Sequence, residues 1–169
     1  VLKRDGVCYS KEEYVRKKYK ESAKVFINAY GWFVKEAQHI VPKPEGAEYP
    51  YWAFTDLYNV DQTGDGHVLT LDVPIGEAIL FDMFDWTKIM QMHYIGENES
   101  EEAAFSEELK NMGMNEFQIM TSNFYPEQKA RIQESWKRLF GHQQAIEAGN
   151  NSGVHSVQAG LWCIKGEWI

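Results

Sequence analysis

Hydrophobic residues recur at intervals of three and four early in the chain, and this spacing predicts a helical region from residue 10 to about residue 40. Five side chains form its apolar face: Phe26, Tyr30, Phe33, Ala37 and Ile40. Ser10 with Glu13 gives a capping-box pattern at the start of the region. Gly31 is a point at which it can divide into two helices, and the prolines and glycine of 42–46 end it.

Later patterns predict three more helices: from Asp85 to about His93, from Asn98 to Gly113 and from Pro126 to Gly141. Each begins at a residue type that favours a helix start. Asp85 and Asn98 carry side-chain acceptors for the free N–H groups of a first turn, and Pro126 suits a first helical position.

Alternating or short continuous apolar runs predict the strands: 7–9, 51–58, 67–74, 78–82, 117–122 and one strand within 154–169. The second and third of these flank a glycine-rich turn, so they are expected to form a central hairpin over about 51–73. The fold class is therefore α+β, with a mixed or antiparallel sheet and four to five flanking helices. At 169 residues the chain is expected to form a single domain, 1–169.

The stretch DQTGDGHVLTLD at 61–72 allows two interpretations. Oxygen side chains at its first, third, fifth and twelfth positions, with Gly66 at the sixth, follow the pattern of a calcium-binding loop. That loop needs a helix on each side, whereas both flanks here have the pattern of strands. Asp-Gly between two strands is also a strong hairpin signal. We interpret the stretch as a hairpin turn.

Composition and charge narrow the classes of function. The chain carries a formal net charge of −8, from 25 acidic residues against 17 Lys and Arg. This balance argues against a protein that grips a nucleic-acid backbone, because such binding needs clustered cations. No apolar run is long enough to span a membrane, and we expect no membrane partner.

Two cysteines, Cys8 and Cys163, are too few for a disulfide scaffold, and a reduced cytoplasmic location is expected. The five histidines have no metal-ligand spacing, so no metal site is predicted, and the common hydrolase and nucleotide-loop motifs are absent. The chain starts at Val1 with what resembles the last turn of a helix, capped by Gly6. An upstream strand and helix are therefore expected before it.

Several sequence pieces, in order, carry a resemblance: AYGWFVKEAQ (29–38), YPYWAF (49–54), VLTLDVP (68–74), AILFDMFDW (78–86), RIQESWKRLF (131–140) and VQAGLWCIKGEWI (157–169). Together they resemble a family of bacterial and phage-borne proteins catalogued only as a domain of unknown function. The resemblance covers nearly the whole chain. It implies a strand and helix ahead of Val1, and it brings no activity and no functional residues.

A second, more distant resemblance is to ADP-ribosyltransferase-like folds, many of which carry Gln-Ala-Glu in a late strand. The piece QAGLWCIKGEWI is similar in outline, with Gln158 and Ala159 matching and Gly160 where the catalytic Glu would stand. This resemblance implies NAD as a possible cofactor. The departure at Gly160 implies that the activity is lost or that a different acid serves. Glu167 lies seven residues on and is a poor substitute.

Four residues are the candidate ligand-binding set: Trp52, Asp82, Trp86 and Gln158. The tryptophans stand near strand ends, where they can stack on a planar ligand or simply belong to the core. Asp82 and Asp85 can form a carboxylate pair at a pocket, or a strand end followed by a helix cap. No catalytic residue is assigned.

Three functions remain open at this point. The first is a protein that holds a small nucleotide-like ligand in an aromatic-lined cleft without converting it. The second is an ADP-ribosyltransferase-like enzyme that uses NAD. The third is an acidic protein–protein interaction or inhibitory module that engages a basic partner.

Overall fold

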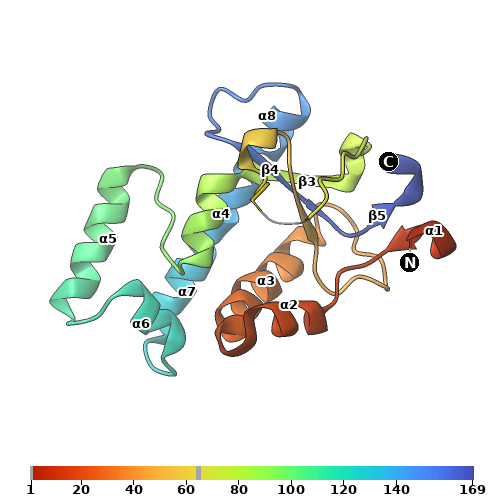
Figure 1. Ribbon diagram of the computed structural model, residues 1–169. Coiled ribbons are helices and arrows are strands. Elements are labelled where there is room, and N and C mark those ends of the chain that lie inside the picture. The colour runs from red at the N-terminus through yellow and green to blue at the C-terminus, as the bar shows by residue number, and fades with distance from the viewer. Residues whose placement is uncertain (1, 64–65) are drawn as a thin grey trace.

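A central antiparallel sheet of three strands organises the molecule, and its middle strand is the last of the three in the chain (Figure 1). The computed structural model describes residues 2–63 and 66–169. The sheet runs in the order β2 (Tyr51–Phe54), β4 (Val157–Leu161) and β3 (Ala78–Asp82). Because β4 pairs with strands from two distant parts of the chain, the sheet is complete only when the C-terminal region of the chain is in place.

The two faces of this sheet are fixed by the pairing register. Trp52 lies beside Gly160, and Phe54 beside Gln158, so these side chains share one face. Phe81 also lies beside Gln158 on that face. The opposite face carries Leu80, Ala159 and Leu161, which form a smaller apolar cluster with Ile146.

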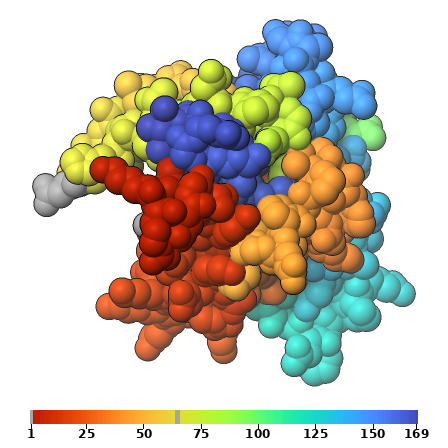
Figure 2. Space-filling view, turned by 90° about the vertical axis from the view of Figure 1, so that its right-hand side faces the viewer, coloured from red at the N-terminus to blue at the C-terminus, as the bar shows by residue number. Residues whose placement is uncertain are grey.

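A two-stranded sheet joins the ends of the described chain. β1 (Val7–Cys8) pairs antiparallel with β5 (Ile164–Lys165). It follows α1 (Leu2–Asp5), whose left-handed cap is Gly6 with φ of 70°. Figure 2 shows the N-terminal segment in red against the C-terminal segment in blue.

Helices pack on both faces of the sheet (Figure 1). Their bounds are α2 Glu12–Tyr19, α3 Ala23–Ala37, α4 Met83–Met90, α5 Glu99–Asn111, α6 Glu116–Thr121, α7 Pro126–Ser135 and α8 Gln143–Glu147, with 3₁₀ turns at Lys20–Ser22, Leu57–Asn59, Ile75–Glu77, Trp136–His142 and Gly166–Trp168. α3 and α4 supply core residues on the Trp52 face, and α8 supplies Ile146 on the other.

An aromatic cluster fills the space between α3 and the sheet, with Phe33 at its centre. The Phe33 side chain is fully buried. Its ring centroid lies 5.0–6.5 Å from the centroids of other rings: Trp52, Phe81, Trp86, Phe140 and Trp162. Most of these pairs are edge-to-face, the arrangement that aromatic quadrupoles favour. Burial of these large rings explains the high aromatic content of the sequence.

The α+β class and an antiparallel sheet are confirmed, but the predicted central hairpin over 51–73 is wrong. β2 pairs with β4, and residues 66–74 form no strand. The alternating pattern of this stretch comes from packing and not from strand pairing. Leu71 and Val73 contact the Ile146 cluster, and the Asp72 N–H donates to the Trp168 carbonyl at 2.7 Å. Residues 64–65 of the predicted turn, and with them Asp65 of the calcium interpretation, lie outside the described residues.

Two helix boundaries also differ from the prediction. The N-cap of α4 is Asp82, whose side chain accepts from the Phe84 N–H at 3.0 Å, and not Asp85. The region 10–40 does divide in two, but at Lys20–Ser22, where Lys20 has φ of 50°, rather than at Gly31.

Two further local predictions are wrong. At the start of α2 the free N–H of Glu12 donates to Glu48, a residue distant in the sequence, so Ser10 does not cap this helix. The stretch 117–122, predicted as a strand, is mostly helix, because Asn115 and Gln118 form a capping box that starts α6.

A buried glutamine closes one edge of the sheet. Gln143, at the start of α8, is only 6% exposed. Its Oε1 accepts from the Leu80 N–H at 2.5 Å, and its Nε2 donates to the Ala78 carbonyl at 3.2 Å. The side-chain amide thus bonds the outer edge of β3 as a neighbouring strand would, and satisfies backbone groups that would otherwise be buried without a partner.

Candidate functional site

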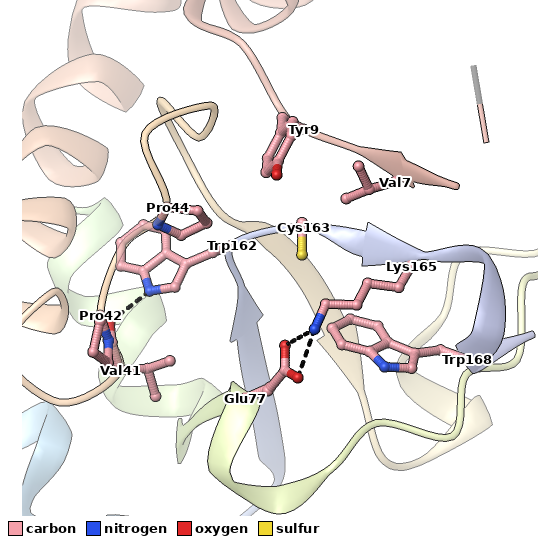
Figure 3. A pocket seen from close by; sticks show the side chains of 10 residues that line it. All are labelled: Val7, Tyr9, Val41, Pro42, Pro44, Glu77, Trp162, Cys163, Lys165 and Trp168. Atoms are coloured by element: carbon pink, nitrogen blue, oxygen red, sulfur yellow. Dashed lines mark hydrogen bonds and ion pairs between the residues drawn. The ribbon is translucent and has the colours of Figure 1, made fainter. Parts of the chain in front are cut away.

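A pocket of about 240 Å³ lies where the two-stranded sheet meets the loop after α3 (Figure 3). Its walls come from parts of the chain that are far apart in sequence: Val7, Tyr9, Val41, Pro42, Pro44, Glu77, Trp162, Cys163, Lys165 and Trp168. We call it the Trp162 pocket. Three of its lining residues are aromatic, and an ion pair lies at its wall.

Trp162 is held in place by a hydrogen bond from its own ring. Its Nε1 donates to the Val41 carbonyl at 2.7 Å, as the dashed line in Figure 3 marks. The residue is 3% exposed and follows directly after β4. Pro42 and Pro44 restrict the facing loop, because proline fixes φ. The indole and the loop therefore form a pre-organised wall.

Lys165 and Glu77 form the charged part of the pocket. The Lys165 Nζ lies 2.6 Å from the Glu77 carboxylate and 5.0 Å from the centroid of the Trp168 ring. The hydrogen bond to Glu77 raises the pKa of Lys165, so the amine stays cationic. Both side chains are partly accessible, so solvent screens the ion pair and weakens it.

Cys163 also lines the pocket but is a poor nucleophile there. Burial raises the pKa of its thiol. The thiolate is the reactive form of cysteine, and this environment disfavours it. The residue contributes a small apolar surface to the pocket wall rather than a reactive group.

The structure brings three of the four predicted site residues to one face of the sheet but not to this pocket. Trp52 and Trp86 lie with ring centroids 4.6 Å apart within the aromatic cluster. Trp52 Nε1 and Gln158 Oε1 are buried and have no hydrogen-bond partner among the described residues. Neither tryptophan lines the Trp162 pocket, so ligand binding by these residues stays a prediction.

Asp82 lies at the end of β3 and is 3% exposed. Its carboxylate accepts from the backbone N–H groups of Phe84, His155 and Ser156, and the His155 Nδ1 lies 2.9 Å from Oδ2. Burial disfavours the charge, but these hydrogen bonds outweigh it, and the pKa of Asp82 is lowered.

The pKa of Asp85, which lies in the first turn of α4, is shifted in the opposite direction. Burial, and then the nearby charge of Asp82, raise its pKa, while Lys88 and His142 partly compensate. The two carboxyl groups predicted as a pair are thus unequal. Asp82 is a buried, fully bonded cap, and Asp85 is a half-buried acid that ionises less readily.

We expect Asp85→Asn to stabilise the protein at neutral pH. A raised pKa means that the folded state binds the proton more tightly than the unfolded state, so ionisation of Asp85 above its folded pKa costs stability. The variant should therefore have a higher melting temperature at pH 7, with a gain that disappears below about pH 4. Thermal unfolding across this pH range measures it. Glu107→Gln, on the exposed surface of α5, is the control, and a variant no more stable than wild type at pH 7 would contradict the expectation.

At Gly160, which the resemblance to ADP-ribosyltransferase-like folds would align with a catalytic Glu, a side chain fits only with rearrangement of its neighbours. An added Cβ would lie 2.9 Å from Cζ of Phe33 and 3.6 Å from Cζ3 of Trp52. A glutamate at this position would enter the aromatic cluster rather than a solvent-filled cleft.

Other site types have little support among the described residues. Within 2–63 and 66–169, no group of three or more His, Cys, Asp and Glu side chains is placed to hold a metal ion. In the same ranges, no helix combines the length and the apolar character needed to cross a bilayer. Acids of α5 and of the residues just before it are paired with bases: Glu102 with Lys88, Glu108 with Arg131, and Glu97 and Glu101 with Arg138.

Sequence comparison identifies the chain only at the level of family. A family model described as Domain of unknown function (DUF3841) matches residues 1–169. No curated protein and no solved structure matches the chain. The activity must therefore be argued from the geometry of the molecule.

Proposed function

The chain belongs to the family described as Domain of unknown function (DUF3841), and we propose that it binds a small planar ligand in the Trp162 pocket without converting it. The observation that carries the proposal is the pocket itself, a cavity with aromatic walls and one ion pair. Apolar lining with a few placed polar groups is the usual composition of a ligand site.

The size of the pocket limits the ligand. Its volume of about 240 Å³ lies just below the range of roughly 300–1,000 Å³ typical of sites for drug-sized molecules. A single heterocyclic ring of nucleobase or nicotinamide size fits this space, whereas a whole dinucleotide does not. The proposed ligand is therefore a ring compound or the ring end of a larger molecule whose remainder lies outside.

The polar groups of the pocket indicate which substituent the ligand ring carries. Lys165 offers hydrogen-bond donors and Glu77 offers acceptors, side by side. An amide or aminocarbonyl group on the ligand can bond both, since it presents an acceptor and a donor together. Trp168 beneath the Lys165 amine, and Tyr9 across the pocket, add aromatic surface for the ring (Figure 3).

The chemistry of the residues that line the Trp162 pocket supports binding of the ligand without its conversion. Cys163 has a raised thiol pKa, and Lys165 is held as a cation, so neither is poised as a nucleophile. NAD-dependent transfer has weaker support than binding, because the Gly160 position is blocked by Phe33. An acidic interaction module rests on the net charge alone.

Binding is tested with a panel of nucleobases, nicotinamide and indole derivatives, by native mass spectrometry and tryptophan fluorescence. We expect one or more amide-bearing rings to bind, and Lys165→Met to weaken that binding about tenfold or more through loss of a charged hydrogen bond. Lys110→Met, on exposed α5, is the matched control and should bind as wild type does. If no ring of the panel binds, or if both variants bind equally well, the proposal is wrong.

A further inference from the structure

His155 and Asp82 form a histidine–carboxylate pair at the surface, on elements away from the Trp162 pocket. Asp82 ends β3, and His155 lies two residues before β4. The Asp82 Oδ2 accepts from the backbone N–H of His155 at 2.9 Å and lies 2.9 Å from Nδ1 of the same residue. The carboxylate is 4% exposed, whereas the imidazole is 73% exposed.

The buried carboxylate fixes the tautomer of the ring. An ionised carboxylate only accepts hydrogen bonds, so Nδ1 must carry the proton that it shares with Oδ2. The neutral imidazole then has its lone pair on Nε2. No hydrogen bond to Nε2 occurs among residues 2–63 and 66–169.

The ring is also held from the side. The rings of His155 and Phe84 have centroids 4.9 Å apart, with an interplanar angle of 31°. Backbone and ring bonds to one carboxylate oxygen, together with this contact, leave the imidazole little freedom of rotation. A fixed, accessible nitrogen lone pair backed by a buried carboxylate is the arrangement that activates histidine in catalytic sites.

Within residues 2–63 and 66–169, none of the other four histidines has its Nδ1 bonded to a buried carboxylate. His39 and His67 are exposed, and His93 lies 3.9 Å from the Glu116 carboxylate through Nε2. His142 is half-buried, with its ring against Gly153. The other four histidines therefore serve as internal references for the reactivity of an imidazole without this arrangement.

The surroundings of His155 define the class of substrate. Asp82 and the neighbouring Asp85 disfavour anions, while the exposed Phe84 ring offers apolar surface. Leu57 and Tyr58 are also exposed, and Asn59 beside them donates to the Ser156 hydroxyl at 2.7 Å, which places this apolar turn near His155.

We propose that His155 is a nucleophile toward uncharged, activated acyl compounds, with Asp82 as its positioning residue. The Nε2 lone pair bonds to the carbonyl carbon, and the leaving group departs as an alkoxide with the electrons of the broken C–O bond. The acyl-imidazolium that remains keeps its Nδ1 proton, and its charge is stabilised by the Asp82 carboxylate. Water then adds to the acyl carbon, and the bond between this carbon and Nε2 breaks with its electrons returning to Nε2. The water oxygen leaves in the carboxylic acid and one water proton goes to the alkoxide, so that ester and water give acid and alcohol.

The first test compares histidines within the wild-type protein. Diethylpyrocarbonate transfers an ethoxycarbonyl group to imidazole nitrogen, and peptide mapping by mass spectrometry gives the initial rate at each site. We expect His155 to react about tenfold or more faster than His39 and His67, the gain that an activated nucleophile requires. Rates within about twofold of one another would overturn the proposal, whatever the outcome of ligand binding at the Trp162 pocket.

The second test separates activation from mere exposure. Asp82→Asn keeps the size of the side chain and an acceptor for the cap of α4 but removes the charge. The His155 rate should fall to that of His39, and nitrogen NMR should show loss of the Nδ1–H tautomer seen in wild type. Turnover of p-nitrophenyl acetate should fall in His155→Asn and not in His39→Asn. An unchanged tautomer in Asp82→Asn, or unchanged turnover in His155→Asn, would contradict the proposal.

Discussion

Replacing Phe33 with alanine is expected to lower the free energy of unfolding by about 3–5 kcal/mol, the usual cost of deleting a buried phenyl ring. The ring is fully buried on α3 and contacts aromatic rings from β2, β3, α4 and the segment after β4. Those rings belong to separate elements and cannot all move into the cavity, so little of the loss is recovered by collapse. Denaturant unfolding followed by tryptophan fluorescence measures the change.

Phe124→Ala is the matched control for this measurement, because the Phe124 side chain is 75% exposed. It should change stability by no more than about 0.5 kcal/mol. A loss below about 1 kcal/mol in Phe33→Ala would mean that the aromatic cluster is more loosely packed than its centroid distances indicate.

Gly160→Ala is expected to cost about 1–3 kcal/mol, the second of the two large effects. The cause is overpacking, since the new Cβ would lie 2.9 Å from Cζ and 3.2 Å from Cε1 of Phe33. The backbone of β4 cannot retreat, because it is paired on both sides. Phe33→Leu shortens the facing side chain, so Gly160→Ala should cost less in that background, with a coupling of at least about 0.5 kcal/mol.

Gly76→Ala provides the reference, because a Cβ added at Gly76 meets no atom within 4 Å. Equal effects of the two glycine variants, or simple additivity with Phe33→Leu, would show that the close approach of Phe33 does not constrain position 160.

Local signals in the sequence predicted those elements that depend on nearby residues. Asn98 caps α5 through the Glu101 N–H, and Pro126 begins α7, as their positions indicated. β3 and β4 were also located, because continuous apolar runs mark strands that are buried throughout. These predictions succeeded because the physical cause lies within a few residues of each element.

The prediction failed where distant residues decide the structure. Strand-like alternation at 67–74 predicts strand pairing, but the same pattern arises when a chain lies extended over a core. At the start of α2 the capping group is Glu48, which no local pattern can reveal. The Trp162 pocket is assembled from four separate segments, so its residues were missed. The only signal for them was the concentration of large side chains in WCIKGEW at the end of the chain.

The candidate site predicted from sequence was partly assembled by the fold. Trp52, Trp86 and Gln158 do converge on one face, since strand pairing and α4 place them there. Sequence could not show that the space between them is closed, because this depends on Phe33 from α3. Asp82 was selected as a carboxylate of interest, but its partner His155 lies 73 residues away and joins it only through the β3–β4 pairing.

The amide of Gln143 sets a limit on how this protein can associate. A sheet edge with free N–H and C=O groups can recruit a strand from a second molecule, and chains of such additions lead to fibres. Here the Leu80 N–H and the Ala78 carbonyl are already bonded to one side chain. A foreign strand would have to displace Gln143 and bury its amide elsewhere. Polymerisation through β3 is therefore opposed by a single residue that contributes no strand of its own.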